Sequence, residues 1–236
     1  METEYDPQKI NEFILTKCII KLNKEKCTLA SGRESHCYVN WRDVLNDVYL
    51  CSYIAQNIIS FTNQQELHID CFIGVPDGAT KLAVLTNYLH ATSNPHFNEG
   101  SHTLPILRLE KKTHGTEQDK QYVGTPKGNV CIIEDVTTTG ESLIRTALEP
   151  LLETPNIKVI ASLALTNRCE LRKDGKSVEN FLKETYHIPH YWLSNLPTLL
   201  PQVYTQQKEE LGQSAKTIAE TVKREFQTQG INLKLE

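Results

Sequence analysis

Short apolar runs alternate with helical patterns through the middle of the chain. The runs are rich in branched residues, which is typical of buried strands, and they cover 69–75, 104–109, 130–133 and 158–166. Apolar residues spaced three and four apart predict helices at 47–61, 80–89 and 143–152. Because strands and helices alternate, the core is predicted to be α/β with a mostly parallel central sheet.

The two ends of the chain add further elements. Asp6 and Pro7 are typical of a helix start, and the apolar stripe that follows extends toward Ile19 and Ile20. A Ser-Gly-Arg turn and an aromatic strand at 37–41 predict a hairpin. Near the C-terminus, helices are predicted from Ser177, over 197–206 and, as an amphipathic tail, over 207–227. The tail could cover the core or mediate oligomer contacts.

Composition narrows the class of protein. The chain has 236 residues and a formal net charge of −4, without a block of Lys and Arg, so no nucleic-acid partner is expected. Its seven cysteines show no Cys-x-x-Cys spacing, which favours reduced thiols. There is no apolar signal core and no apolar run of about 18 residues. We therefore expect a soluble, cytoplasmic protein without a membrane partner.

The most informative stretch is 130–142, Val-Cys-Ile-Ile-Glu-Asp-Val-Thr-Thr-Thr-Gly-Glu-Ser. A buried strand leads to two carboxylates, Glu134 and Asp135, and then to a turn of small and hydroxyl residues before a helix. Backbone N–H groups in such a turn favour a phosphate. Carboxylates beside a phosphate are repulsive unless they hold a sugar hydroxyl or act through a metal ion. Ribose and Mg²⁺ are therefore the expected ligands. An ordinary strand with an acidic turn would not explain the carboxylates and threonines together.

This stretch resembles the signature of type I phosphoribosyltransferases. The resemblance implies that Glu134 and Asp135 hold the ribose hydroxyls of phosphoribosyl diphosphate (PRPP). It implies that residues 137–142 bind the 5′-phosphate, and that the turn Asp77-Gly78-Ala79 lies under the diphosphate. Mg²⁺ would be bound mainly through PRPP, with no metal ligand assigned to a side chain.

Flanking segments resemble the orotate phosphoribosyltransferases in particular. Residues 28–42 are similar to their hood, where Tyr38 would lie over the orotate ring, although Ala30 stands where the family usually has lysine. Residues 108–115 are similar to the flexible catalytic loop that closes over the neighbouring subunit's site, with Leu109 in place of another lysine. Taken alone, this loop reads as a solvated charged segment. Arg168 matches the arginine that pairs with the orotate carboxylate, and its alternative is a strand-end surface arginine.

The resemblance thus implies a complete set of site residues. The residues expected to take part in catalysis are Asp135, Lys112 and His114. Those expected to bind PRPP are Arg108, Lys111, Lys112, His114, Glu134, Asp135, Thr137, Thr138, Thr139, Gly140, Glu141, Ser142, Asp77 and Gly78. Those expected to contact orotate are Tyr38, Thr138 and Arg168.

Together these observations predict a type I phosphoribosyltransferase fold with flanking helices and a small hood. The phosphoribosyltransferase domain would span 1–206, with the hood built from about 1–42 and part of the C-terminal third, and 207–236 would be a helical extension. The expected reaction is orotate plus PRPP giving orotidine 5′-monophosphate and diphosphate, in a homodimer with a shared active site and with Mg²⁺. Two alternatives are a phosphoribosyltransferase for another nucleobase and a catalytically weak PRPP sensor. A regulator usually carries a helix-turn-helix, and none is recognised in this chain.

Overall fold

A computed structural model describes residues 4–236, except for the side chains of residues 117 and 118. Its centre is a four-stranded sheet in the order β3–β6–β7–β8, with every neighbouring pair parallel. The strands are β3 (Cys71–Gly74), β6 (Gly128–Thr137), β7 (Ile157–Asn167) and β8 (His190–Asn195). The predicted α/β class with a mostly parallel sheet is confirmed, and the carboxyl ends of these strands meet at one edge.

Helices cover both faces of the sheet because β6 alternates its side chains between two cores. Val130 and Ile132 join one core, which packs under the segment that follows β6, whereas Cys131 and Ile133 join the other. The first face carries the π-helical segment η2 (Leu143–Leu148), α5 (Glu149–Leu152) and α6 (Val178–Tyr186). The second carries α1 (Pro7–Thr16), α2 (Val48–Gln64) and α3 (Thr80–Ser93).

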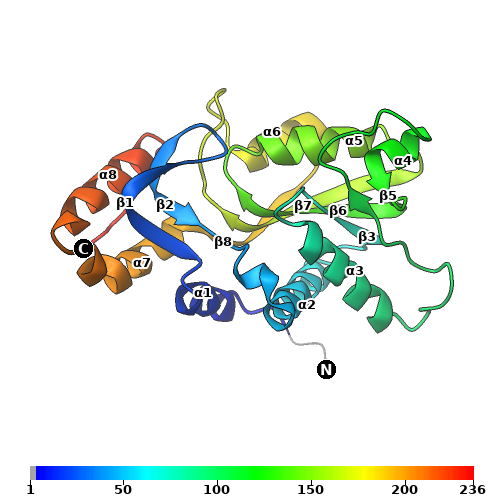
Figure 1. Ribbon diagram of the computed structural model, residues 1–236, viewed down its shortest axis with the longest axis horizontal. Helices are drawn as coiled ribbons and strands as arrows, with labels where there is room; N and C mark the ends of the chain where they lie inside the picture. The colour runs from blue at the N-terminus through cyan, green and yellow to red at the C-terminus, as the bar shows by residue number, and fades with distance from the viewer. Residues whose placement is uncertain (1–3) are drawn as a thin grey trace.

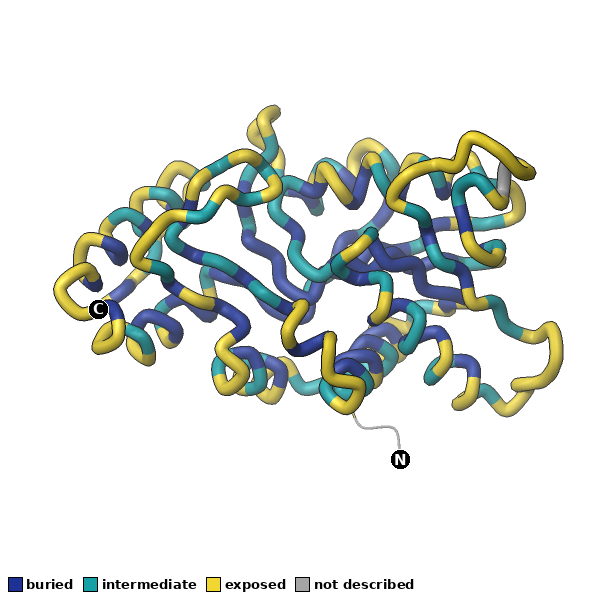
Figure 2. The backbone as a smooth tube through the Cα atoms, viewed as in Figure 1, coloured by how far each residue is buried: buried dark blue, intermediate teal, exposed yellow. Residues whose placement is uncertain are grey.

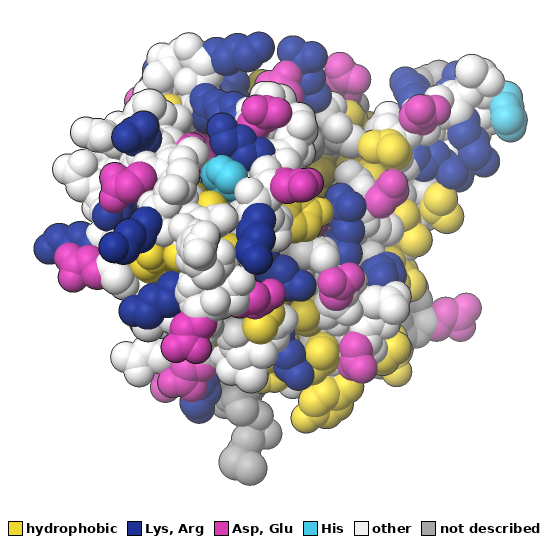
Figure 3. All heavy atoms as spheres, turned by 60° about the vertical axis from the view of Figure 1, so that its left-hand side comes forward, with side chains coloured by type: hydrophobic (Ala, Val, Ile, Leu, Met, Phe, Trp, Pro, Cys, Tyr) yellow, Lys and Arg dark blue, Asp and Glu magenta, His cyan; other side chains and the backbone are white. Residues whose placement is uncertain are grey.

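A second, smaller unit forms the hood at one end of the molecule (Figure 1). Strands β1 (Ile20–Thr28) and β2 (Glu34–Val39) pair antiparallel, and a short turn, η1 (Val44–Asn46), connects them to α2. Helix α7 (Leu196–Leu211) packs against β1. A turn, η3 (Gly212–Ser214), then leads to α8 (Ala215–Gln227), which packs against β2. Charges of both signs are interspersed on the face of Figure 3, which brings this end forward.

The C-terminal tail covers the core of this hood. Ile218, Val222 and Phe226 of α8 are each at most 2 % exposed. The boundary predicted between residues 206 and 207 falls inside α7, which continues to Leu211. Of the two roles that the sequence left open for the tail, covering the core is the one that these contacts support.

Two expectations about local structure are corrected. The first helix ends at Thr16, and Cys18 adopts a positive φ of 49°, so Ile19 and Ile20 leave the helix. Ile20 instead opens β1 opposite Val39. The run 104–109 contributes only β4 (Ile106–Leu107), because Pro105 has no N–H to donate to a ladder.

Strand β4 also stands apart from the central sheet. It pairs with β5 (Tyr122–Val123), and the short helix α4 (Glu117–Gln121) lies between them. The connecting loop is exposed, whereas the interior of the central strands is buried (Figure 2). Among residues 4–236, no helix is both long enough and apolar enough to cross a membrane.

Candidate active site

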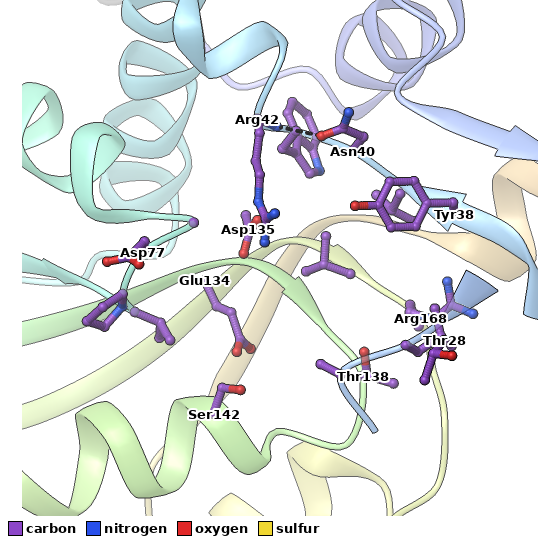
Figure 4. A pocket seen from close by; sticks show the side chains of 18 residues that line it. Thr28, Tyr38, Asn40, Arg42, Asp77, Glu134, Asp135, Thr138, Ser142 and Arg168 are labelled. Atoms are coloured by element: carbon purple, nitrogen blue, oxygen red, sulfur yellow. Dashed lines mark hydrogen bonds between the residues drawn. The ribbon is translucent and has the colours of Figure 1, made fainter. Parts of the chain in front are cut away.

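A cavity of about 390 Å³ lies between the hood and the carboxyl edge of the central sheet (Figure 4). It brings together side chains that are far apart in the chain and that come from β2, the β3–α3 turn, β6 and the end of β7. The residues predicted from the sequence that line it are Tyr38, Asp77, Gly78, Glu134, Asp135, Thr138, Ser142 and Arg168. The β3–α3 turn, the segment at the end of β6 and Arg168 at the end of β7 therefore meet in one cavity.

The two carboxylates of β6 point to opposite sides of the sheet. Glu134 follows the alternation of Val130 and Ile132 and is directed toward Ser142, whereas Asp135 is directed toward Arg42 (Figure 4). The pair therefore reaches two different parts of the cavity. One carboxylate lies beside the Thr-rich loop, and the other faces the hood.

Glu134 is an unusual carboxylic acid because it is only 4 % exposed. Burial raises the pKa of Glu134 to about 8, and the charge of Asp135 also raises it, although hydrogen bonds from the Thr137 hydroxyl and the Leu143 N–H oppose the shift. At neutral pH the free protein therefore holds Glu134 mostly protonated. In that state the group offers an O–H donor as well as an acceptor, which suits a sugar hydroxyl.

Asp135 lies against the β3–α3 turn. Burial raises the pKa of Asp135, while the N–H of Val136 and the positive charge of Arg42 lower it. Gly78 is in close contact with this side chain, because a Cβ added at Gly78 would come within 2.5 Å of the Asp135 Oδ2 atom. Glycine at this position thus lets the turn approach the carboxylate. The Pro76–Asp77 peptide bond in the same turn is cis.

The Thr-rich loop frames a smaller recess beside the main cavity. Ala30 and Ser31 of the hood lie opposite the loop, and the predicted residues Thr138, Thr139, Gly140, Glu141 and Ser142 line the recess. The Ser31 hydroxyl is buried there without a hydrogen-bond partner among the described residues. A phosphate oxygen in the recess would satisfy it.

Two further contacts shape this loop. Gly140 has φ +69°, and a Cβ there would come within 2.7 Å of Val178 Cγ1, so only glycine fits without movement. Arg172 donates from Nη1 to the Thr139 carbonyl oxygen over 2.8 Å. Thr137, by contrast, is fully buried and its hydroxyl is taken by Glu134, so its side chain lines neither space.

Arg168 is fixed in a buried ion network instead of lying on the surface, so the strand-end surface alternative is wrong. Its side chain is 1 % exposed, and Nε donates to Glu170 Oε1 over 2.7 Å. Nη1 donates to the Cys37 carbonyl over 3.0 Å, while Nη2 lies 3.5 Å from both Ser35 Oγ and Glu225 Oε1. Burial lowers the pKa of Arg168, but Cys37, Glu170 and Glu225 together raise it further, so the group stays charged. Arg168 also lines the cavity.

Hood residues close the cavity from the other side. Tyr38 projects from β2 and lines the cavity (Figure 4), on the strand whose Cys37 carbonyl accepts a hydrogen bond from Arg168. Trp41 is fully buried and donates from Nε1 to Thr166 Oγ1 over 2.9 Å, which ties the end of β2 to strand β7. This hydrogen bond anchors the hood to the central sheet close to Tyr38 and Arg168.

The charged loop after β4 does not reach this cavity. None of the lining residues is Arg108, Lys111, Lys112 or His114, although the resemblance implied that these four bind PRPP. The reason is topological, because β4 belongs to the separate β4–β5 pair and not to the central sheet. Within the loop, Arg108 Nε donates to the Asp119 carbonyl over 3.2 Å, and Lys111 lines a different recess.

Sequence reasoning missed several cavity residues that come from the hood. Thr28, Asn40 and Arg42 all line the cavity. Arg42 follows directly after the predicted aromatic strand, so its place at the end of that strand was the signal available in the sequence. No group of three or more His, Cys, Asp or Glu side chains that could hold a metal ion occurs among the described residues.

Relatives identify the family. No family model matches the chain. An orotate phosphoribosyltransferase from Methanosphaera stadtmanae is 32 % identical over 144 residues, which span 61 % of this chain and 72 % of that protein. One from Pyrococcus abyssi is 28 % identical over 153 residues, or 65 % of this chain and 78 % of the relative. The match to bovine uridine 5′-monophosphate synthase, 28 % identical over 149 residues, covers 62 % of this chain but only 28 % of that longer protein.

Solved structures share the fold. The orotate phosphoribosyltransferase from Aeropyrum pernix superposes with a TM-score of 0.59 at 22 % identity, covering 82 % of this chain and 97 % of that one. The enzyme from Mycobacterium tuberculosis in complex with PRPP gives a TM-score of 0.53 at 17 % identity, covering 82 % and 98 %. These likenesses agree with the predicted type I phosphoribosyltransferase fold. With a relative above 30 % identity and most of that relative's length matched, this chain belongs to the orotate phosphoribosyltransferase family.

Proposed function

We propose that this protein transfers the phosphoribosyl group from PRPP to orotate, giving orotidine 5′-monophosphate and diphosphate, a step of pyrimidine biosynthesis. The observation that carries the proposal is the cavity in which the Glu134–Asp135 pair, Tyr38 and Arg168 meet, together with the adjoining recess lined by residues 138–142. Relatives named as orotate phosphoribosyltransferases support the same substrates.

The chemistry requires little covalent participation from the protein. As diphosphate leaves, C1′ of the ribose gains oxocarbenium character, and catalysis comes from positioning and from stabilising charge. Glu134 and Asp135 hold the ribose hydroxyls from two sides, since their carboxyl groups point to opposite faces of β6 (Figure 4). Asp135 is the carboxylate nearer the hood, and so the one that faces the reacting side of the sugar.

The 5′-phosphate occupies the recess formed by residues 138–142. Loop N–H groups and hydroxyls donate to it, and the otherwise unpaired Ser31 hydroxyl adds a donor from the hood. The bond from Arg172 to the Thr139 carbonyl stiffens the loop before the substrate arrives. Binding at this remote group supplies energy that positions C1′.

Orotate occupies the space between Tyr38, Thr138 and Arg168. The aromatic ring of Tyr38 covers the base, and the positive charge of Arg168 pairs with the orotate carboxylate. Because Glu170 and Glu225 hold Arg168 in place, the guanidinium loses little side-chain entropy when the base binds.

The loop that carries Arg108, Lys111, Lys112 and His114 acts on the site of a second subunit in a homodimer. It lies outside the cavity of its own chain, and exposed apolar side chains lie beside it. Those side chains are Tyr88, Leu104, Leu109 and Val123, each at least 46 % exposed. Burying them against a second copy would stabilise the dimer and bring the loop's cations to the leaving diphosphate.

Mg²⁺ fits this site as a companion of PRPP. Bound Mg²⁺ would neutralise charge on the leaving diphosphate. In this proposal Mg²⁺ is held mainly through PRPP, with Asp77 and Asp135 as neighbouring cavity carboxylates, and the described residues contain no group of three or more His, Cys, Asp or Glu side chains that could hold it alone. Proteins usually bind Mg²⁺ through one or two carboxylates together with the phosphates of the substrate.

The unpaired state of the cysteines supports a cytoplasmic location. All seven cysteines are free, and four of them are buried. Thiols that remain unpaired are typical of a reducing compartment.

The first test is orotate depletion measured with PRPP and Mg²⁺. Turnover that requires both would support the proposal. If PRPP binds by calorimetry but orotate is not consumed, the alternatives are another nucleobase or a catalytically weak sensor. The sensor has one specific feature in its favour, because Ala30 lines the cavity where the resemblance leads us to expect a lysine. Absence of PRPP binding would refute the proposal outright.

A further inference from the structure

The cavity is short of available positive charge for a substrate as anionic as PRPP. Its acidic lining residues are Asp77, Glu134 and Asp135, and its basic ones are Arg42 and Arg168. The cations of the β4–β5 loop lie outside it. Within this cavity, the cationic side chains that the chain itself offers to the diphosphate are therefore the two arginines.

The guanidinium of Arg168 is already bound by other groups of the protein. Its guanidinium donates to Glu170, to the Cys37 carbonyl and toward Glu225, and its side chain is 1 % exposed. Arg42 differs from Arg168 in both its exposure and its hydrogen bonding. Its side chain is exposed, and its backbone N–H donates to Asn40 Oδ1 over 3.1 Å. Among the described residues, the Arg42 guanidinium has no hydrogen-bonding partner, so all its donors are available to a ligand.

The position of Arg42 selects which group of the substrate it meets. In Figure 4 it reaches from the end of β2 toward Asp135, while Thr138 and Ser142 lie on the far side of the carboxylate pair. The 5′-phosphate recess is thus remote from Arg42. With the ribose held by Glu134 and Asp135, the group nearest Arg42 is the one on C1′.

The backbone that presents Arg42 is well anchored. The preceding Trp41 is fully buried and bonded to Thr166, and Asn40 is tied to Asp43 through a 2.8 Å bond from Nδ2 to Oδ2. The guanidinium is therefore delivered from a fixed point with only its own side chain free to move. A planar fork of this kind matches two phosphate oxygens at once.

We propose that Arg42 binds the diphosphate group of PRPP and so acts as a residue that positions the leaving group within its own subunit. The inference rests on the proposed function, because it assigns a role within that site. It predicts that Arg42 contributes to binding of diphosphate-containing ligands and not to binding of the ribose 5-phosphate portion.

The test compares three ligands by calorimetry in the presence of Mg²⁺, namely PRPP, inorganic diphosphate and ribose 5-phosphate. Arg42→Gln is expected to weaken binding of PRPP and of diphosphate about 10- to 100-fold, the effect of losing charge-assisted hydrogen bonds, and to leave ribose 5-phosphate within about 2-fold. Arg42→Lys should restore part of the loss, since it keeps the charge but not the fork. Arg224→Gln, at an exposed arginine of α8 outside the cavity, is the matched control.

Each outcome separates the inference from the proposed function. Unchanged diphosphate binding in Arg42→Gln, with a wild type that binds PRPP and consumes orotate, would overturn the inference alone. An equal loss for ribose 5-phosphate would mean that Arg42 acts by neutralising Asp135, which also overturns it. A wild type that binds no PRPP would overturn both. The melting temperature of each variant, expected to equal that of the wild type, checks that the fold is intact.

Discussion

The buried pair of Arg168 and Glu170 makes a sharp prediction about stability. We expect Glu170→Gln to destabilise the protein by about 3 kcal/mol, because it removes the charge that compensates a buried guanidinium. The two side chains are 1 % and 2 % exposed, and the Nε–Oε1 distance is 2.7 Å. Glu170 also accepts from Arg33 Nη1 over 2.8 Å, so one substitution removes the carboxylate from two ion pairs.

The size of the destabilisation expected for Glu170→Gln follows from two opposing contributions to the free energy of the buried ion pair. At an effective dielectric constant of about 20, charges at this separation attract by about 6 kcal/mol, but desolvating each ion offsets several kcal/mol of that. Breaking one side of a buried pair typically costs about 3–5 kcal/mol. Glutamine still offers an acceptor to Arg168, and Glu225 lies 3.5 Å from its Nη2, so the lower end of that range is expected.

The assay is urea denaturation followed by far-ultraviolet circular dichroism at pH 7. The control is Glu220→Gln, which breaks an exposed pair with Lys223 at 3.1 Å and is expected to change the unfolding free energy by at most about 1 kcal/mol. If Glu170→Gln costs no more than this control, Arg168 does not depend on Glu170 for compensation, and the role assigned to the Glu170 carboxylate is wrong. The variant should also raise the KM for orotate, since Arg168 would lose its fixed orientation.

Three further predictions concern the Glu-Asp pair and the loop beside it. Asp135→Asn should raise the KM for PRPP about 10-fold or more while leaving the melting temperature unchanged; an unchanged KM would count against ribose binding by Asp135. Gly140→Ala should weaken PRPP binding by displacing the phosphate loop from Val178, and it should destabilise the fold by about 1–3 kcal/mol, measured by calorimetry and denaturation. Glu134 has a folded pKa of about 8 against an ordinary 4.5, so the unfolded chain loses this proton first and stability should fall as pH rises between those values. Glu134→Gln should remove this slope, at most about 1.4 kcal/mol per pH unit, and equal slopes in variant and wild type would refute the pKa assignment.

The pH experiment needs the difference between variant and wild type because His190 acts in the opposite direction. Burial lowers the pKa of His190 to about 4, so the unfolded chain binds this proton first as pH falls below about 6.5. His190 therefore lowers stability toward acid, whereas Glu134 lowers it toward alkaline pH. Subtracting the curve of unfolding free energy against pH of Glu134→Gln from that of the wild type cancels the contribution of His190 and leaves that of Glu134.

Local patterns in the sequence were sufficient for the parts of the site that are contiguous in the chain. The apolar run at 130–133 predicts a buried strand, and because side chains alternate along a strand, Glu134 and Asp135 leave it on opposite faces. The Thr-rich loop could be predicted because a strand, two carboxylates, hydroxyl residues and a glycine stand within the 13 residues 130–142, directly before a predicted helix.

The sequence was misleading where neighbouring apolar residues belong to different elements. Ile19 and Ile20 continue the stripe of the first helix by spacing, yet a positive φ at Cys18 redirects the chain and β2 recruits Ile20 as a strand partner. Similarly, the run 104–109 looks like another core strand, but Pro105 and pairing with β5 remove it from the central sheet. Hydrophobic periodicity predicts that a residue is buried, but it does not predict which other element packs against that residue.

The amino-acid sequence by itself determined the α/β class, through the alternation of strands and helices between residues 69 and 166. It also determined the strand–loop–helix segment with its pair of carboxylates, because that segment depends on residues adjacent in the chain. Only the tertiary structure decided that Arg168 is held by Glu225, 57 residues away, and that Arg42 faces Asp135. It alone turned Thr137 inward and left the loop of Lys112 and His114 outside the cavity. These facts arise from contacts between distant segments, whose geometry is set by how the hood, the sheet and the C-terminal helices pack and not by any local pattern.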